Sequence, residues 1–409
     1  MDGEQQPPST ADSPEKASVQ SPKEVLAAAV SDALNDTKTR VLAIWRRLPL
    51  WAQIILIGLG ALCVVAWRYQ ELVFRNWHLI RLVPRVAFAG RNRFVMSSDT
   101  EEAVRTAIAA LEREGASDLS ASARYPPIVL YEALSAAQTI ISMRQPRRDV
   151  LATIDLQKDK NCQCWAQFSN MPPNIFVTAW VLRAYALGHR KPGNGELEFL
   201  LTRQGDGGWP LYDDTRDLST FATAHAVLAL HDLIEAKVLT PEQSAQAEVA
   251  LNRGIGYLRG SCSGGRWRYY PDRSDSALSD ADSGLAIYTL HYVGRGDRKL
   301  DKLWLNSLPR EDLGSRDDEV SNARWLYRIT PQQPPLPDPV RHLRLPWILA
   351  GTVSAYPSGS LWQRAKAAAF VEEILDQPDG SSLLPPENFR RSQLLIALRY
   401  LEKSARPSR

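Results

Sequence analysis

Residues 199–230 read FLLTRQGDGGWPLYDDTRDLSTFATAHAVLAL, and this stretch decides the fold. A first apolar run ends near Gln204, the turn Gly207–Trp209 follows, and a second apolar run starts at Ser219. The glycines allow a tight turn, and serine is a preferred cap at the start of a helix. The stretch therefore predicts two helices joined by a turn and a polar loop, which is the unit of a helical repeat.

The same unit recurs along the chain. A second copy repeats the offsets with Arg253-Gly254, Tyr257, Ser261, Gly265 and Trp267, and its next helix is expected to begin near Asp280. Weaker copies run from Leu156 to Trp165, before a helix over 173–188, and from 377 to 381, before a helix over 389–401. The apolar stretches 126–142 and 320–327 are expected to supply further inner helices. About six helical hairpins result.

These motifs carry a resemblance to a known superfamily. Leu200-x-x-x-Gln204 with Gly207-x-Trp209 resembles the QW repeat of squalene and oxidosqualene cyclases, which also occurs in protein prenyltransferase β subunits. The resemblance covers roughly residues 100–405 and implies an all-α, (α/α)6-type toroid. It also implies an active site where the inner helices begin. We expect the repeat residues to be structural: Gln204, Gly207, Trp209, Tyr257, Gly265 and Trp267.

The N-terminal quarter differs from the repeats in its pattern of polar and apolar residues. Residues 1–20 are polar and predict a disordered tail, and 21–47 predict an amphipathic helix. Leu50–Trp67 has no charged residue and is long enough to span a bilayer, so 48–68 is predicted to be a single transmembrane helix. A basic juxtamembrane connector follows over 69–97, which would lie on the bilayer or pack on the toroid domain of 98–405.

The net charge of +3 and the pI of about 8.6 give no reason to expect nucleic-acid binding. Arginines and lysines stand in similar number on both sides of the apolar span, so charge does not fix its orientation. No signal peptide precedes the short polar tail, and we therefore expect the N-terminus inside and the toroid outside.

Asp280-Ala281-Asp282-Ser283 stands at a predicted inner-helix start. It resembles the DxDD motif of class II terpene cyclases, in which the middle carboxyl protonates an alkene or epoxide. The first and middle acids match, and serine replaces the last. The resemblance makes Asp282, supported by Asp280, the candidate catalytic acid. The alternative is that both acids stabilise the first turn of a helix.

A second group of candidates would bind a ligand. Asp213, Asp214 and Asp217 lie in another predicted loop before an inner helix, and Arg268 and Tyr269 belong to a basic aromatic loop. Solvated turns explain both groups equally well. Asp317-Asp318-Glu319 occupies a similar place.

We predict no cofactor, with zinc or magnesium as the alternatives. Cys162-x-Cys164 is too tightly spaced for a usual structural zinc site, and His225 lies in an apolar helical run where it would pack in the core. The acidic loop with Asp213, Asp214 and Asp217 could instead bind a metal diphosphate, with magnesium as the metal, or a cation.

Three functions stay open. We favour a membrane-anchored module that binds a lipid or a protein partner, the partner docking through 21–47 or the toroid. The alternative is an enzyme acting on isoprenoids or other lipids. A third is a glycan-active lyase or hydrolase, because Gln204–Pro210 also resembles a stretch of some toroidal pectate lyases. Catalysis itself is left undecided, since a fold does not fix a function.

Overall fold

The structure is a computed structural model that describes residues 49, 77–124, 133–166, 172–212, 217–308, 319–327, 336–375 and 388–406. The chain divides into two units, 1–76 and 77–409. Apart from Pro49 the first unit lies outside the described residues, and so do the predicted tail, amphipathic helix and transmembrane span. None of the described helices is both long enough and apolar enough to cross a bilayer.

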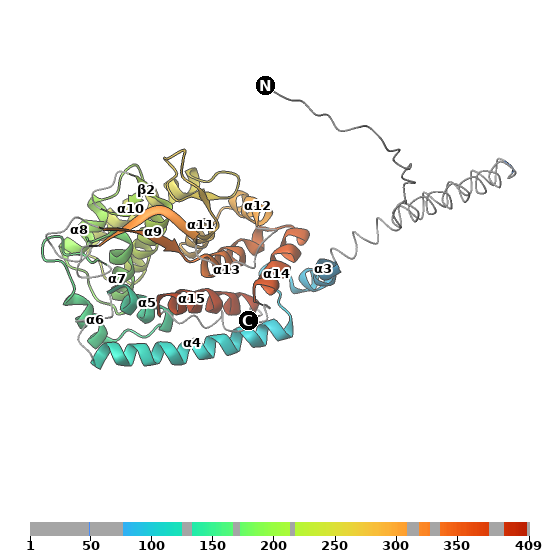
Figure 1. Cartoon of the computed structure of the whole chain (residues 1–409), viewed down its shortest axis with the longest axis horizontal. Coiled ribbons are helices and arrows are strands. Elements are labelled where there is room, and N and C mark those ends of the chain that lie inside the picture. The colour runs from blue at the N-terminus through green and yellow to red at the C-terminus, as the bar shows by residue number, and fades with distance from the viewer. Residues whose placement is uncertain are drawn as a thin grey trace, which may run out of the picture. The chain divides into compact units, whose positions relative to one another are not determined.

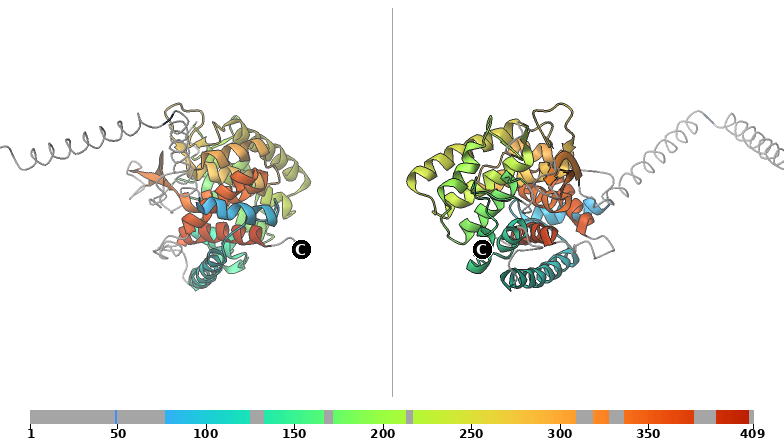
Figure 2. Two further views of the ribbon diagram at one scale, coloured as in Figure 1. Left: turned by 90° about the vertical axis from the view of Figure 1, so that its right-hand side faces the viewer. Right: turned by 60° about the vertical axis from the view of Figure 1, so that its left-hand side comes forward.

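Among the described residues of the second unit, six helices form a closed inner ring. Each contacts the next in chain order, and the last contacts the first, which closes the ring. Figures 1 and 2 show the last and first of them, α15 and α5, side by side. The inner helices are α5 (Ala133–Met143), α7 (Ile175–Leu187), α9 (Thr220–Glu235), α11 (Asp280–Tyr292), α13 (Arg344–Ala355) and α15 (Asn388–Ala405).

An outer helix precedes each inner helix in the chain and packs outside the ring. The long helix α4 runs along α5 and α15 (Figure 1). The predicted α/α toroid of about six hairpins is thus present in the described part of the chain, which is mostly helical and also contains three two-stranded sheets. The outer helices are α4 (Ser98–Arg124), α6 (Arg148–Asp155), α8 (Asn194–Thr202), α10 (Pro241–Gly260), α12 (Arg298–Ser307) and α14 (Leu361–Leu375).

The inner helices are buried on nearly all sides, which explains why their sequences are apolar without a clear helical period. In α7, every residue from Ile175 to Ala186 is buried. Neighbouring inner helices approach closely where small residues meet: Gly284 of α11 faces Gly351 of α13. Such contacts let two backbones pack without side chains between them.

Helix α3 (Trp77–Ala89) belongs to the segment predicted as a basic connector, and it packs on α14. Its Leu82 and Val86 are buried, so its apolar face is covered by the toroid unit. A 3-10 turn, η1 (Tyr356–Ser358), joins α13 to α14.

Two short ladders link loops to the inner-helix starts. Strand β1 (Trp209–Pro210) pairs with β2 (Leu218–Ser219), and β3 (Trp267–Arg268) pairs with β4 (Leu278–Ser279). In both ladders the repeat tryptophan is opposite the serine that begins the next helix.

The prediction of an inner helix over 320–327 was wrong. This segment is strand β5 (Glu319–Tyr327), paired antiparallel with β6 (Leu336–His342), and Figure 2 shows the pair at the edge of the helices. Five prolines between 331 and 339 prevent helical continuation, and prolines fit a two-stranded edge. The inner helix at this place is α13, which begins after the sheet.

Candidate active site at the inner-helix starts

Three outer-to-inner turns are built alike around a buried tryptophan. The indole N–H groups donate to carbonyls near the ends of the outer helices: Trp165 to Ile154 at 2.9 Å, Trp209 to Leu200 at 2.7 Å and Trp267 to Leu258 at 2.6 Å. Carbonyls in the last turn of a helix lack the usual partner within the helix, so the indole supplies one. The Ile154 carbonyl accepts in addition from the Gln157 backbone N–H at 3.1 Å.

The other predicted repeat residues also make contacts that hold a turn. The Gln204 amide donates to the carbonyls of Gly207 and Ala250, each at 2.9 Å. Gly207 and Gly265 both have a φ of +94°, where a side chain would be strained. Tyr257 packs its ring against Gly208.

The inner helix after each of these turns begins with the same hydrogen bonds. The side chains of Asn174, Ser219 and Ser279 cap the helices by accepting from the backbone N–H three residues on. One residue later, a hydroxyl accepts from the backbone N–H of the repeat tryptophan. These bonds join Trp165 to Thr178 at 3.2 Å, Trp209 to Thr223 at 2.9 Å and Trp267 to Ser283 at 2.8 Å.

When the three helix starts are compared by position after the cap, the candidate acids stand where the other two helices carry no charge. Three residues after the cap, α11 has Asp282 while α7 and α9 have Val177 and Ala222. One residue after the cap, Asp280 stands where the others have Ile175 and Thr220. Since Ser279 already caps α11, neither carboxylate is needed as the cap.

Asp282 is 1% exposed and pairs with a histidine from a distant part of the chain. Its Oδ1 lies 2.8 Å from Nδ1 of His342, the last residue of β6, which is 2% exposed. Its Oδ2 is buried and has no hydrogen-bond partner among the described residues. A buried carboxyl oxygen without a partner is unusual and marks a place where a proton or a ligand can be held.

Asp280 is held differently, between two arginines. Arg266 lies 2.5 Å from its Oδ1, and Arg344, the first residue of α13, lies 3.1 Å from its Oδ2. The two acids of one helical turn therefore have different environments: Asp280 is ion-paired, and Asp282 faces a histidine and rings.

Aromatic rings surround the pair and continue toward the centre of the toroid. Tyr269 and Phe221 lie 4.6 and 4.8 Å from the His342 ring, measured between ring centroids. Phe221 then contacts Phe176 at 4.4 Å. The starts of α7, α9 and α11 and the end of β6 thus meet at one end of the ring.

Below them His225 is fully buried among rings, and neither ring nitrogen has a partner among the described residues. Phe176, Phe221, Trp180 and Trp347 lie within 4.8 to 5.7 Å of it. Burial, with Arg183 and His342 contributing, holds the pKa of His225 well below its usual value. The imidazole is therefore neutral and belongs to the packed core, as its apolar helix predicted.

The candidate ligand-binding residues are only partly brought together. Tyr269 lies at the Asp282–His342 pair, whereas the Arg268 guanidinium donates to the carbonyls of Ser274 and Ser276 in its own loop. Asp217 is half-exposed and pairs with Arg273 at 3.2 Å. Asp213 and Asp214 lie outside the described residues, as do Asp317 and Asp318.

In the described part of the chain, no three His, Cys, Asp or Glu side chains gather as metal ligands would. Cys162 and Cys164, which were considered for zinc, are joined in a disulfide.

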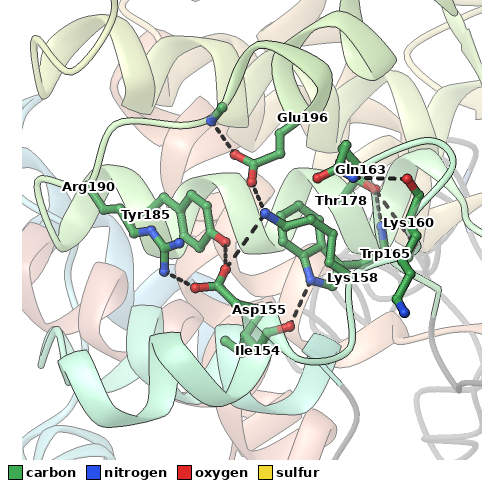
Figure 3. A network of polar contacts seen from close by, with 11 residues as sticks. Ile154, Asp155, Lys158, Lys160, Gln163, Trp165, Thr178, Tyr185, Arg190 and Glu196 are labelled. Atoms are coloured by element: carbon green, nitrogen blue, oxygen red, sulfur yellow. Dashed lines mark hydrogen bonds and ion pairs between the residues drawn. The ribbon is translucent and has the colours of Figure 1, made fainter.

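A second polar cluster lies among α6, α7 and α8 (Figure 3). Asp155 accepts from Tyr185 and Arg190, and Lys158 pairs with Glu196. Its charged groups are matched within the cluster, which ties three helices together and leaves no obvious reactive group there.

Sequence reasoning missed His342 and Arg344. They follow a proline-rich stretch and match no repeat, and only the ring closure brings them to α11. A histidine directly before an apolar helix was the one available signal.

No protein-family model matches this chain, and no curated protein matches it. A product complex of the type II terpene cyclase MstE from Scytonema is similar in structure, at 15% identity and a TM-score of 0.45, covering 76% of this chain and 100% of that one. A reducing-end-xylose releasing exo-oligoxylanase is similar at 12% identity and a TM-score of 0.45, covering 73% and 93%.

The predicted α/α toroid is present among the described residues, as a ring of six inner helices with six outer helices. The ring of inner helices defines that fold from this chain's own contacts. Likenesses this distant carry no argument about activity, so the function is argued from the residues alone.

Proposed function

We propose that this protein is an enzyme that protonates an apolar, isoprenoid-type substrate with Asp282. The observation that carries the proposal is the Asp282–His342 pair: a buried carboxyl with one oxygen on a histidine and the other without a partner among the described residues. This choice puts the isoprenoid enzyme ahead of the binding module that the sequence alone favoured.

The chemistry follows from the two oxygens of one carboxyl. A proton on Oδ2 would be transferred to a carbon–carbon double bond, whose π electrons form the new C–H bond as the O–H bond breaks. The carboxylate left behind accepts from Nδ1–H of His342, which offsets the charge that develops on it.

The surroundings suit the cation that this step creates. Aromatic faces attract positive charge, and Phe221 and Tyr269 adjoin the pair while Phe176 lies next to Phe221. The apolar walls exclude water, which would otherwise capture the cation. Because Asp282 is 1% exposed, neighbouring side chains must move to admit the substrate.

The test is to incubate the purified full chain with squalene and geranylgeraniol in D2O and to analyse the extracts by gas chromatography–mass spectrometry. We expect a cyclised product that carries deuterium from the initiating step. Asp282→Asn should lower its formation about 10²- to 10⁴-fold, the usual contribution of a general acid. His342→Gln should lower it less.

Asp275→Asn is the matched control, because Asp275 is an exposed acid of the preceding loop. It should retain wild-type turnover. If wild type and Asp282→Asn bind the same unaltered lipid and neither forms a product, the binding-module function replaces the enzyme.

We also propose that Leu50–Trp67 anchors the protein in a membrane, which would keep the toroid beside a pool of apolar substrate. Membrane fractionation of the full chain and of a chain lacking 48–68 tests this. We expect only the full chain to resist carbonate extraction; equal release of both would reject the anchor.

A further inference from the structure

The other end of the inner ring holds a cavity of about 710 Å³. It is lined by the last turns of α5, α7, α9 and α11 and by the C-terminal half of α15. Asp282 is in the first turn of α11, while Tyr288, His291 and Tyr292 of the same helix line this cavity. The cavity is therefore a separate place from the proposed active site, and its size is typical of small-molecule sites.

Two buried side chains, Arg183 and Tyr288, form its floor, and each is 3% exposed. Arg183 donates from Nε to Asp232 at 2.7 Å and also hydrogen-bonds Tyr292, whose hydroxyl donates to the same carboxylate. A guanidinium has five N–H donors, so further donors remain for a ligand. The Tyr288 hydroxyl makes no hydrogen bond with the described residues. Both side chains line the cavity, so their remaining donors can reach a molecule held there.

Both donors keep their protons at neutral pH. Burial raises the pKa of the Tyr288 hydroxyl above its usual range. Burial by itself would lower the pKa of Arg183, but Asp232 and the nearby tyrosines outweigh it and raise that pKa. Arg183 and Tyr288 therefore both present donors, N–H and O–H groups, to the cavity.

The lining carries more positive than negative side chains: Arg144, Arg183, Arg399 and Lys403 against Asp232 and Glu235. Carbonyls at the helix ends contribute partial negative charge, which these cations offset in part. Arg399 offsets such a charge directly, because it donates to the Ser142 carbonyl near the end of α5; it also pairs with Glu112. Arg144 and Lys403 are exposed at the rim.

The rim also contains backbone strain. Arg144 directly follows the end of α5 and has a φ of 55°. His189 lies two residues past the end of α7 and has a φ of 48°. Both values fall in the left-handed region, which favours glycine. After α11 the comparable turn has Gly294, with a φ of 68°. Lys237, in the corresponding turn after α9, has a φ of 54° although it does not line the cavity, so this conformation belongs to the helix ends.

Tyrosine rings complete the wall. Tyr292 and Tyr400 lie 5.6 and 5.3 Å from Tyr288, and the Arg183 guanidinium lies 5.6 Å from the Tyr292 ring. Ile141, Leu187 and Ile396 add apolar surface. Donors at the floor, cations at the rim and rings between them match a molecule with an anionic head and an apolar body.

We infer that this cavity is a binding site for an organic anion, with a carboxylate or phosphate on Arg183 and Tyr288 and its apolar part against the tyrosines. This site does not depend on the proposed acid catalysis at the opposite end.

Titration calorimetry of the purified full chain with hexyl phosphate, hexanoate, hexanol and inorganic phosphate tests the inference. The two hexyl anions should bind at least about tenfold more tightly than hexanol, and more weakly as salt is raised. Inorganic phosphate binding as tightly as hexyl phosphate would identify the ligand as a small free anion; weaker binding would identify an amphiphile such as a lipid headgroup.

Two variants separate binding from folding. Tyr288→Phe keeps the ring and should weaken anion binding about 3- to 10-fold, the effect of one lost hydrogen bond. Arg144→Gly should weaken binding while raising Tm, because glycine suits the positive φ. Lys299→Ala, an exposed cation on α12, should match wild type. Equal binding of hexanol and the anions, or unchanged binding in both folded variants, would overturn the inference.

Discussion

The backbone N–H of Trp267 donates a 2.8 Å hydrogen bond to the hydroxyl of Ser283, which also donates to the carbonyl of Ser279. Thr178 and Thr223 accept the same bond in the two other turns. The serine that departs from the acidic DxDD pattern thus occupies a hydroxyl position of the repeat.

This relationship predicts the stability of two variants. Ser283→Ala leaves a buried N–H without its acceptor and should lower the free energy of unfolding by about 1–3 kcal/mol. Ser283→Thr retains the hydroxyl and should cost much less. Urea denaturation measures both; equal losses would contradict the role of the hydroxyl.

The contact between α11 and α13 predicts a steric effect. A Cβ on Gly284 would lie 2.3 Å from the Trp347 carbonyl oxygen, so the two backbones would have to separate. Gly284→Ala should destabilise the protein by about 1–3 kcal/mol or more. Gly256→Ala is the control, because a Cβ there meets nothing within 4 Å and alanine favours the helix. Thermal denaturation should move in opposite directions for the two variants.

The repeat tryptophans allow a matched comparison. Trp209 donates to the Leu200 carbonyl at 2.7 Å, whereas the equally buried indole N–H of Trp304 has no partner among the described residues. Both Phe variants lose similar volume, but only Trp209→Phe leaves an acceptor unpaired. It should be the more destabilising by about 1–2 kcal/mol. Chemical denaturation of the two variants side by side checks the difference.

His225 predicts a dependence of stability on pH. Its pKa is lowered in the folded state, so the unfolded chain binds more protons at acidic pH and stability is lost as pH falls below the unfolded pKa of about 6.5. The loss from this group should approach about 1.4 kcal/mol per pH unit. His225→Leu should reduce the slope of unfolding free energy against pH between 6.5 and 5; an unchanged slope would show that other groups cause it.

Much of the fold was predictable because its signals are local. Ser219 begins a helix, the Gly207–Trp209 turn precedes it, and the copies at Trp165 and Trp267 behave in the same way. Residues 320–327 were misassigned because a short apolar run suits either a strand or a buried helix. The prolines that follow it decided in favour of the strand.

The candidate site was predictable only in part. Asp282 could be found because acids at an inner-helix start resemble a known motif. His342 could not, because 60 residues separate it from Asp282 and no spacing rule connects them.

The sequence by itself determined the helical hairpins, the turns that join them and the acids at one helix start, since each depends on residues close together in the chain. The tertiary structure alone decided that Asp282 meets His342 and that Arg183 and Tyr288 share a cavity at the other end. The reason is geometric: both sites form only when the ring of helices closes, and closure depends on packing between residues far apart in sequence.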